Sequence, residues 1–308
     1  MSDPTALESA APLPPRPLAL RAGVPDPADA LASYRAVGRD SRTTILELLG
    51  DGWSWNGKRV LDFGCGSGKV MRHFLAEARE CELWGCDIDA PSIAWLRREL
   101  SPPLHAFVNR QEPPLDQPDG TFDLVWSISV FTHLTDHWAA WLAELHRVLA
   151  PGGLAIVSFL GGAMYEGWTG GAWDEDRIGM TVLDHGQGWE RGGPTVFHSP
   201  WWLREHWGRA FEIVRMREGV APGEHGLVVL RRRPVEVSVA ELERIDPREP
   251  RELAALRHQV WLLQEESARL RAERDALAAA RARRVSRRIA GRLGEMRRRA
   301  GASARSRE

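Results

Sequence analysis

The sequence predicts an α/β fold with a doubly wound, mostly parallel sheet, followed by a helical C-terminal extension. A buried strand at residues 60–63 runs into a loop that carries glycine at every second position. Apolar strands and segments of helical period then alternate along the chain, which is typical of a parallel sheet covered by helices. Towards the C-terminus the apolar spacing becomes three and four residues, which predicts a separate long helix.

The N-terminal segment, residues 1–28, is rich in proline and alanine and has no basic residue before Arg16. This composition predicts a disordered segment, and the absence of a basic start followed by an apolar run argues against a signal peptide. Residues 29–235 are predicted to form the folded domain. No run in the chain reaches the length of about eighteen apolar residues expected of a membrane span.

The loop from Asp62 to Gly68 is the most informative segment, and three kinds of ligand compete for it. Glycine lacks a Cβ atom, so such a loop can turn sharply and let a ligand contact its backbone. The first turn of a helix is expected to follow and to point N–H groups at the ligand. A phosphate-binding loop would need glycine at Phe63 and a hydroxyl residue at Val70. A dinucleotide fingerprint would need glycine in place of Lys69.

Three later segments place this loop in a larger pattern. Residues 83–89 are predicted to form a second strand that ends in acidic residues, and residues 122–131 a third strand after a Pro-Asp-Gly turn. Apolar residues at helical spacing predict a helix over 138–149, and residues 154–159 are strand-like. Strand, helix and strand in this order predict parallel neighbours in one sheet.

With these motifs in register, residues 34–232 resemble the class I S-adenosylmethionine-dependent methyltransferases. The spacing Asp62-x-Gly64-x-Gly66-x-Gly68 resembles motif I of that family. The resemblance implies a Rossmann-like seven-stranded sheet and S-adenosyl-L-methionine as the methyl donor. Residues 127–134, 147–153 and 197–200 resemble a bacterial subgroup associated with glycan and natural-product chemistry.

The resemblance also implies roles for individual residues of a cofactor site. Asp87 is expected to bind the ribose hydroxyls, with Ile88 over one face of the adenine. Asn109 is expected near the adenine edge and Ser127 beside the cofactor, while Arg39 is either a carboxylate partner or a solvent-facing arginine. The residues expected around the methionine portion are Asp62, which would order the amino end, with Gly64, Cys65, Gly66 and Gly68.

His133 is the candidate general base, because it follows the third predicted strand at the edge where open α/β sheets bind ligands. A neutral imidazole can accept the proton of a hydroxyl acceptor. The alternative is a structural histidine that bonds nearby backbone, and His198 is a second, weaker candidate. Neither the cysteine spacing nor the acidic residues predict a metal site, so we expect no metal.

An insertion over residues 160–207 is expected to bind the acceptor. Its tryptophans suit the flat face of a sugar or a polycyclic substrate, although tryptophan is equally at home in a core; they are Trp168, Trp173, Trp189, Trp201, Trp202 and Trp207. Motifs of DNA, catechol and protein-arginine methyltransferases are missing. We therefore expect O-methylation of a small-molecule or glycan acceptor, with N-methylation as the nearest alternative. A different class of function is a coiled-coil adaptor with a degenerate methyltransferase domain.

Residues 236–250 are predicted to be a linker, since Pro247 and Pro250 close this stretch. Residues 251–280 follow the spacing of heptad a and d positions, which predicts a coiled coil and a homo-oligomer, as a parallel dimer or trimer. A single helix packed back on the domain is the alternative. The positions on the predicted seam are Leu253, Leu256, Val260, Leu263, Ser267, Leu270, Arg274 and Leu277.

Residues 281–308 are predicted to form an arginine-rich amphipathic tail. From residue 251 onward there are sixteen arginines against seven acidic residues, although the whole chain carries a net charge of only −1. Such a tail suits the surface of an anionic membrane; a solvated tail is the alternative, and nucleic-acid binding is less expected. The odd number of cysteines, three, argues against a disulfide framework and favours a reducing cytoplasm, with possible peripheral contact at the inner face of the membrane through the tail. The stripe of the tail consists of Val285, Ile289, Leu293, Met296 and Ala300.

Overall fold

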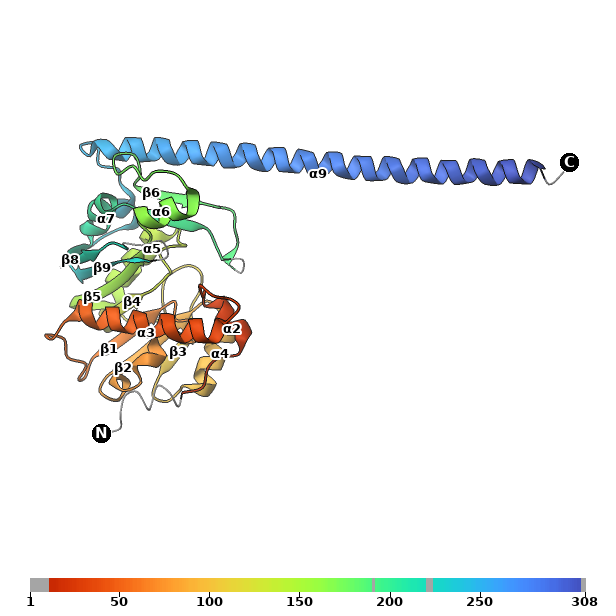
Figure 1. The fold of residues 1–308 in the computed structure, drawn as a ribbon. Helices are drawn as coiled ribbons and strands as arrows, with labels where there is room; N and C mark the ends of the chain where they lie inside the picture. Colours follow the sequence, from red (N-terminus) through yellow and green to blue (C-terminus); the bar gives the residue numbers. More distant parts are fainter. Residues whose placement is uncertain (1–10, 190–191, 220–223, 306–308) are drawn as a thin grey trace. The chain divides into compact units, whose positions relative to one another are not determined.

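The computed structural model describes residues 11–189, 192–219 and 224–305, and most side chains after Arg284 lie outside this description. Its centre is a seven-stranded sheet in the order β3-β2-β1-β4-β5-β9-β8 (Figure 1). Neighbours from β3 to β5 are parallel, and β9 is antiparallel to both β5 and β8. This is the Rossmann-like sheet that the sequence predicts. The strands are β1 (Arg59–Phe63), β2 (Glu82–Asp87), β3 (His105–Val108), β4 (Phe122–Ser127), β5 (Leu149–Phe159), β8 (Phe211–Arg217) and β9 (Gly226–Arg232).

Successive strand residues point to opposite faces of the sheet, and each face packs into a hydrophobic core of its own. Val60 belongs to one core with Ile45 of α3 (Ala30–Leu49) and with α4 (Ala90–Glu99). Leu61 belongs to the other core, which contains α5 (Trp138–Val148) and α7 (Pro200–His206). Helices thus cover both faces and leave the strand ends for ligands.

The expectation of disorder through residue 28 is wrong for the part that the structure describes. A short helix, α2 (Arg16–Arg21), forms there and buries Ala19. The guanidinium of Arg72 donates to the carbonyl oxygens of Ala11 and Pro12 at 2.8 and 2.9 Å. These hydrogen bonds satisfy a buried cation, which is why a proline-rich segment is held against the domain. Residues 1–10 lie outside the described residues.

The predicted insertion forms a small unit of its own at the end of β5. It contains α6 (Gly162–Thr169) and a two-stranded antiparallel sheet of β6 (Met180–Leu183) and β7 (Thr195–His198). Backbone hydrogen bonds join β7 to the main domain: Val196 N donates to Thr132 O and His198 N to Leu160 O, both at 2.8 Å. The insertion therefore lies beside the segment that follows β4.

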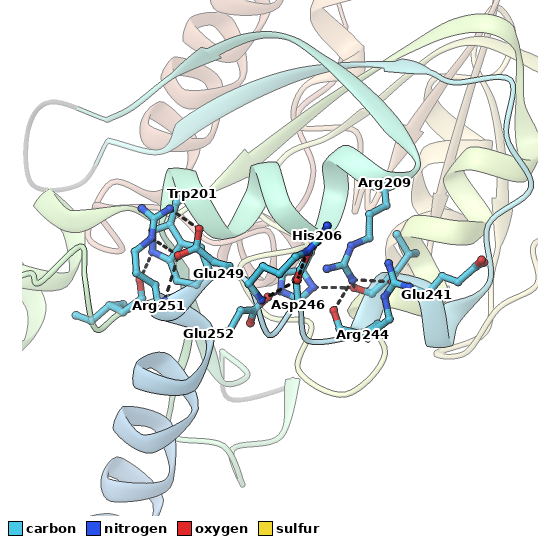
Figure 2. A network of polar contacts seen from close by, with 12 residues as sticks. Trp201, His206, Arg209, Glu241, Arg244, Asp246, Glu249, Arg251 and Glu252 are labelled. Carbon is cyan, nitrogen blue, oxygen red and sulfur yellow. Dashed lines mark hydrogen bonds and ion pairs between the residues drawn. The ribbon is translucent and has the colours of Figure 1, made fainter.

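The predicted linker is more ordered than its prolines indicate. It includes α8 (Val239–Glu243), which starts with a capping box between Ser238 and Glu241 and buries Leu242. Figure 2 shows how this stretch is held: the guanidinium of Arg209 donates to several backbone carbonyl oxygens. These acceptors belong to Glu241, Leu242 and Arg244.

The long helix α9 (Pro250–Arg305) begins where this linker ends. In its first turn the guanidinium of Arg251 lies 4.8 Å from the ring centre of Trp201. The carboxylate of Glu252 lies 3.0 Å from Nε2 of His206, and both side chains are buried (Figure 2). Burial raises the pKa of Glu252 and lowers that of His206 to about 4, so burial disfavours the charged form of both groups.

The chain divides into two compact units, Met1–Leu256 and Arg257–Glu308. In the second unit, α9 continues without interruption through the predicted coiled coil and into the arginine-rich tail. The pairing of this helix with another chain stays a prediction. Among the residues that the structure describes, no helix combines the length and the apolar character needed to cross a bilayer.

Candidate functional site

The candidate site lies where the strand order reverses, at the carboxyl ends of β1, β2 and β4. Asp62 is near the end of β1, Asp87 ends β2 and Ser127 ends β4. Because β1 pairs with both β2 and β4, these three ends meet at one edge of the sheet. Open α/β sheets bind ligands at this reversal point, so the cofactor residues expected from the sequence share one location.

The glycine loop needs its glycines for backbone conformation and for close approach. Gly64, Gly66 and Gly68 have φ values of 82°, 54° and 83°, in the left-handed region that other residues avoid. A Cβ atom on Gly64 would also overlap Cγ2 of Val130, in the segment after β4. The loop therefore passes close to this segment, which a side chain on Gly64 would prevent.

The loop does not present the helix N-terminus that the sequence predicts. It leads into a 3₁₀ turn, η1 (Met71–Phe74), rather than an α-helix. The N–H groups of Gly64 and Cys65 donate to Cys86 O at 2.8 and 3.0 Å, and that of Gly66 donates to Oδ2 of Asp87 at 2.7 Å. These three loop N–H groups are therefore bonded to the neighbouring strand β2.

Asp62 is the most perturbed acid of the site. It is 2% exposed, and burial raises its pKa to about 7, against the effect of the nearby Trp126 indole. Among the described residues, no group donates a hydrogen bond of normal geometry to its Oδ2 atom. A buried carboxylate with an unsatisfied oxygen is suited to a ligand ammonium group.

Two further buried acceptors have no hydrogen-bond partner in the described part of the chain: Oδ1 of Asn109, just after β3, and Oγ of Ser127, at the end of β4. The backbone N–H of Asn109 donates to Asp87 O at 3.1 Å, which fixes Asn109 beside β2. Oδ1 of Asp87 accepts from Asp89 N at 2.8 Å, and burial raises the pKa of Asp87. Ile88 beside it is half-buried. These groups fit a ligand that combines an ammonium, a diol and an aromatic amine.

Two of the expected cofactor residues, Cys65 and Arg39, differ in their surroundings from those described above. A Cβ atom on Gly85 would lie 2.7 Å from Sγ of Cys65, so this thiol packs inward against β2 and not toward the outer face of the loop. Arg39 is exposed on α3. Its neighbour Gly38 instead packs against the backbone of Lys69, which brings α3 onto the loop.

Lys69 is a site residue that sequence reasoning missed. Its ammonium donates to the carbonyl oxygens of Ala22 and Gly23 at 2.5 and 3.0 Å. Burial lowers its pKa to about 8, and Asp62 acts in the opposite direction. Arg21 forms an ion pair with Asp89 at 2.6 Å. Residues 21–23 therefore lie over the glycine loop, a placement that only the ordering of α2 produces.

His133 lies at the expected edge and has a defined tautomer. Its Nδ1 atom is 2.8 Å from the carbonyl oxygen of Pro194, which can only accept, so Nδ1 carries the proton. Nε2 is then an acceptor. Burial lowers the pKa of His133, opposed by this hydrogen bond, so the ring is neutral at pH 7. This arrangement suits a general base.

A second histidine, His225, joins the site from the far end of the sequence. It immediately precedes β9, whose first residue Gly226 pairs with Phe159 at the carboxyl end of β5. Its Nε2 atom is 3.5 Å from Oγ of Ser129. Burial lowers the pKa of His225 to about 4, with the charges of Lys69 and His133 acting in the same direction. The sequence alone does not point to His225, because its place beside the site follows only from the antiparallel placement of β9.

His198 belongs to a core, which removes the second candidate base. It is fully buried, its ring lies against those of Trp202 and Trp207, and neither ring nitrogen has a partner among the described residues. Burial lowers its pKa to about 3, so it is neutral.

The tryptophans of the insertion divide into two groups. Trp201, Trp202 and Trp207 are core residues, as the structural alternative predicts. Trp173 packs over Gly162, and a Cβ atom on that glycine would lie 2.8 Å from its ring. Only Trp168 and Trp189 among the six are largely exposed, at 58% and 45%. Of the six, these two have the rings most accessible to solvent.

Comparisons with known proteins agree with this geometry. Residues 60–153 match a family described as a methyltransferase domain. The 2-methyl-6-phytyl-1,4-hydroquinone methyltransferase of Synechocystis is 38% identical over 104 residues, 33% of this chain and 32% of that protein. The malonyl-[acyl-carrier protein] O-methyltransferase of Serratia marcescens is 33% identical over 148 residues, 47% of this chain and 55% of that protein. The chain thus spans a third to about half of the length of these relatives.

Among solved structures, a SAM-dependent methyltransferase from Methanosarcina mazei covers 61% of this chain and 97% of its own, with a TM-score of 0.47 and 18% identity. The matched residues 60–153 include the glycine loop, Asp87, Asn109, Ser127 and His133. Over residues 60–153 the chain matches a methyltransferase domain, and this match implies S-adenosylmethionine as the methyl donor.

Proposed function

We propose that this protein transfers a methyl group from S-adenosylmethionine to an oxygen atom of a small-molecule or glycan acceptor. The observation that carries the proposal is a set of unsatisfied acceptor atoms at the carboxyl ends of β1, β3 and β4, on the edge of the sheet where the glycine loop lies: Asp62 Oδ2, Asn109 Oδ1 and Ser127 Oγ. A cofactor with an ammonium group at one end and an adenine at the other supplies donors for these atoms.

In the proposed complex, each end of the cofactor has a partner. Asp62 binds the ammonium group, and Asp87 accepts from the ribose hydroxyls with the lone pairs that Gly66 and Asp89 leave available. Asn109 accepts from the adenine amino group. Lys69 is a better carboxylate partner than Arg39, because its ammonium is buried beside Asp62 and has three protons, of which Ala22 and Gly23 take two.

The cofactor supplies a methyl group on a sulfonium, and the protein has to hold the acceptor in line and remove its proton. His133 is the proposed base, with Nε2 as the acceptor atom, since Nδ1 is held by Pro194. His225 lies close to it and helps to hold the acceptor hydroxyl. Relatives named O-methyltransferases, including one from Serratia marcescens, favour oxygen over nitrogen as the acceptor atom.

The acceptor is proposed to lie between the edge of the sheet and the insertion. A Cβ atom on Gly193 would lie 3.5 Å from His133 Nδ1, so the end of the insertion loop covers the base. His185 of the same loop lies 3.6 Å from Asp136. The exposed ring of Trp168 is available for the flat face of the acceptor.

Two measurements test the proposal. Calorimetry with S-adenosylhomocysteine is expected to show one site, weakened at least tenfold by Asp87→Ala. Labelled methyl transfer from S-adenosylmethionine to a pool of small hydroxylated metabolites and glycans, followed by mass spectrometry, is expected to give a methylated product only with the wild-type protein. Absence of cofactor binding at millimolar concentration would contradict the proposal and favour the adaptor function.

The arginine-rich tail carries a second proposal, peripheral binding to an anionic membrane. It rests on the excess of arginine from residue 281 onward along the continuous helix α9. The apolar stripe carries no part of this proposal, because most of its side chains lie outside the described residues. Full-length protein is expected to sediment with vesicles containing anionic lipid, and a variant ending at Ala280 to remain in solution. Equal binding by the two proteins contradicts the proposal.

A further inference from the structure

Helix α9 carries an exposed apolar seam in the unit that begins at Arg257. Its members recur at intervals of three or seven residues, so they lie along one side of the helix. Val260, Leu263, Leu270 and Leu277 are 52%, 40%, 52% and 72% exposed in the single chain. Four large aliphatic side chains in one line on a solvated helix indicate a surface that another helix covers.

We propose that this seam pairs with the same seam of a second copy, in a parallel, in-register, two-stranded coiled coil. Val260, Ser267 and Arg274 occupy a positions, and Leu263, Leu270 and Leu277 occupy d positions. A β-branched residue at a with leucine at d favours two strands, and polar residues at single a positions fix the register. Arg274 can reach solvent past the edge of a two-stranded interface, which a third helix would block.

The surface of the helix has the shape that this pairing requires. A depression on α9 is lined by Val260, Leu263, Gln264, Ser267 and Arg271. Val260 is at an a position, Leu263 and Gln264 are at the d and e positions that follow, and Ser267 is at the next a position. In a parallel coiled coil, this set of four forms the hole that receives a d-position side chain of the partner. In register, that side chain is Leu263 of the second copy.

The charges beside the seam select the parallel orientation. Arg257, Gln264 and Arg271 occupy e positions, whereas Gln259, Glu266 and Glu273 occupy g positions. A parallel pair sets each g residue against the e residue five positions on, so Glu266 meets Arg271 and Gln259 meets Gln264. An antiparallel pair would set e against e and g against g, which brings arginine to arginine and glutamate to glutamate.

Sedimentation equilibrium on the full chain tests the pairing, and it is independent of methyl transfer. The wild-type protein is expected to be a dimer, and Leu270→Lys at a d position to raise the dissociation constant at least tenfold, about 1.4 kcal/mol or more. Ala272→Lys, at the outer f position two residues away, is the matched control and should change it by less than threefold. A monomeric or trimeric wild-type protein, or equal effects of the two lysines, would overturn the proposal.

The orientation is tested by exchange of charges and by cross-linking. Glu266→Arg and Arg271→Glu should each weaken the dimer, and the double variant should restore it. Leu263→Cys and Leu277→Cys, made separately, should each form a disulfide within the dimer, since the native cysteines Cys65, Cys81 and Cys86 are buried. Ala279→Cys at an f position should not. Cross-linking at neither d position, or a double charge variant as weak as the single ones, refutes the parallel arrangement.

Discussion

The Nδ1 atom of His133 lies 2.8 Å from the carbonyl oxygen of Pro194, a contact between residues 61 positions apart. It ties the loop after β4 to the part of the insertion directly before β7 and leaves Nε2 as the acceptor nitrogen. One hydrogen bond thus sets both the orientation and the tautomer of the candidate base.

Replacing this base tests its role directly. His133→Ala is expected to lower kcat about a hundredfold, because general-base catalysis contributes that much or more, with little change in cofactor affinity. His137→Ala, a more exposed histidine on the same segment, is the control and should leave kcat unchanged. A decrease of less than threefold for His133→Ala would show that the residue is structural.

His225 is expected to affect the acceptor more than the cofactor. His225→Ala should raise the KM for the acceptor and lower kcat several-fold, because it removes a neutral imidazole beside Ser129 and His133. Binding of S-adenosylhomocysteine, measured by calorimetry, should stay within threefold of wild type. A selective loss of cofactor binding would instead place His225 with the cofactor residues.

Cofactor affinity is expected to depend on pH through Asp62. Burial raises the pKa of this carboxyl to about 7 in the free protein, and the ammonium group of the bound cofactor would lower it. Binding then releases a proton, so affinity should rise as pH increases from about 5.5 to 7 and level off above. Calorimetry in buffers of different ionisation enthalpy measures this release. Asp62→Asn should abolish it, whereas Asp40→Asn, an exposed acid on α3, should not.

The glycine loop can be tested with a matched pair of substitutions. Gly64 and Gly170 both have left-handed φ values, 82° and 67°, but only a Cβ atom on Gly64 meets another residue, Val130. Gly170→Ala, at the left-handed C-cap of α6, should lower the free energy of unfolding by about 1 kcal/mol, and Gly64→Ala by about 2–4 kcal/mol because overpacking adds to the strain. Urea denaturation measures both. In a Val130→Ala background the two costs should become similar, and a persisting difference would show that the overlap is not the cause.

His198 is predicted to be a source of acid sensitivity. Burial lowers its pKa to about 3, while in the unfolded chain it is about 6.5, so the unfolded state binds more protons between these values. Stability should therefore fall as the pH is lowered through this window. His198→Leu, similar in volume and unable to protonate, should gain about 2 kcal/mol over wild type on going from pH 7.5 to pH 5, measured by urea denaturation. A difference that does not change with pH contradicts this assignment.

Most of the sheet and the location of the site could be predicted because their signals are local. An acid at the end of an apolar strand and glycine at alternate positions of a loop describe one short stretch of backbone, as Asp62 to Gly68 show. The prediction of an α-helix directly after this loop is wrong, because the conformation there depends on a neighbouring strand that the local sequence does not reveal. Residues 71–74 form a 3₁₀ turn instead, and the loop's N–H groups go to Cys86 and Asp87 on the neighbouring strand.

By itself, the sequence determined the fold class, the edge of the sheet where the candidate site residues meet and the methyltransferase motif, since each follows from residues close together in the chain. Tertiary structure decided what depends on distant segments. The antiparallel entry of β9 brings His225 to Ser129, 96 residues away, and the ordering of α2 brings Ala22 to Lys69. Packing also assigned His198 to the core and His133 to the site, because burial and hydrogen-bond partners depend on the whole fold rather than on local spacing.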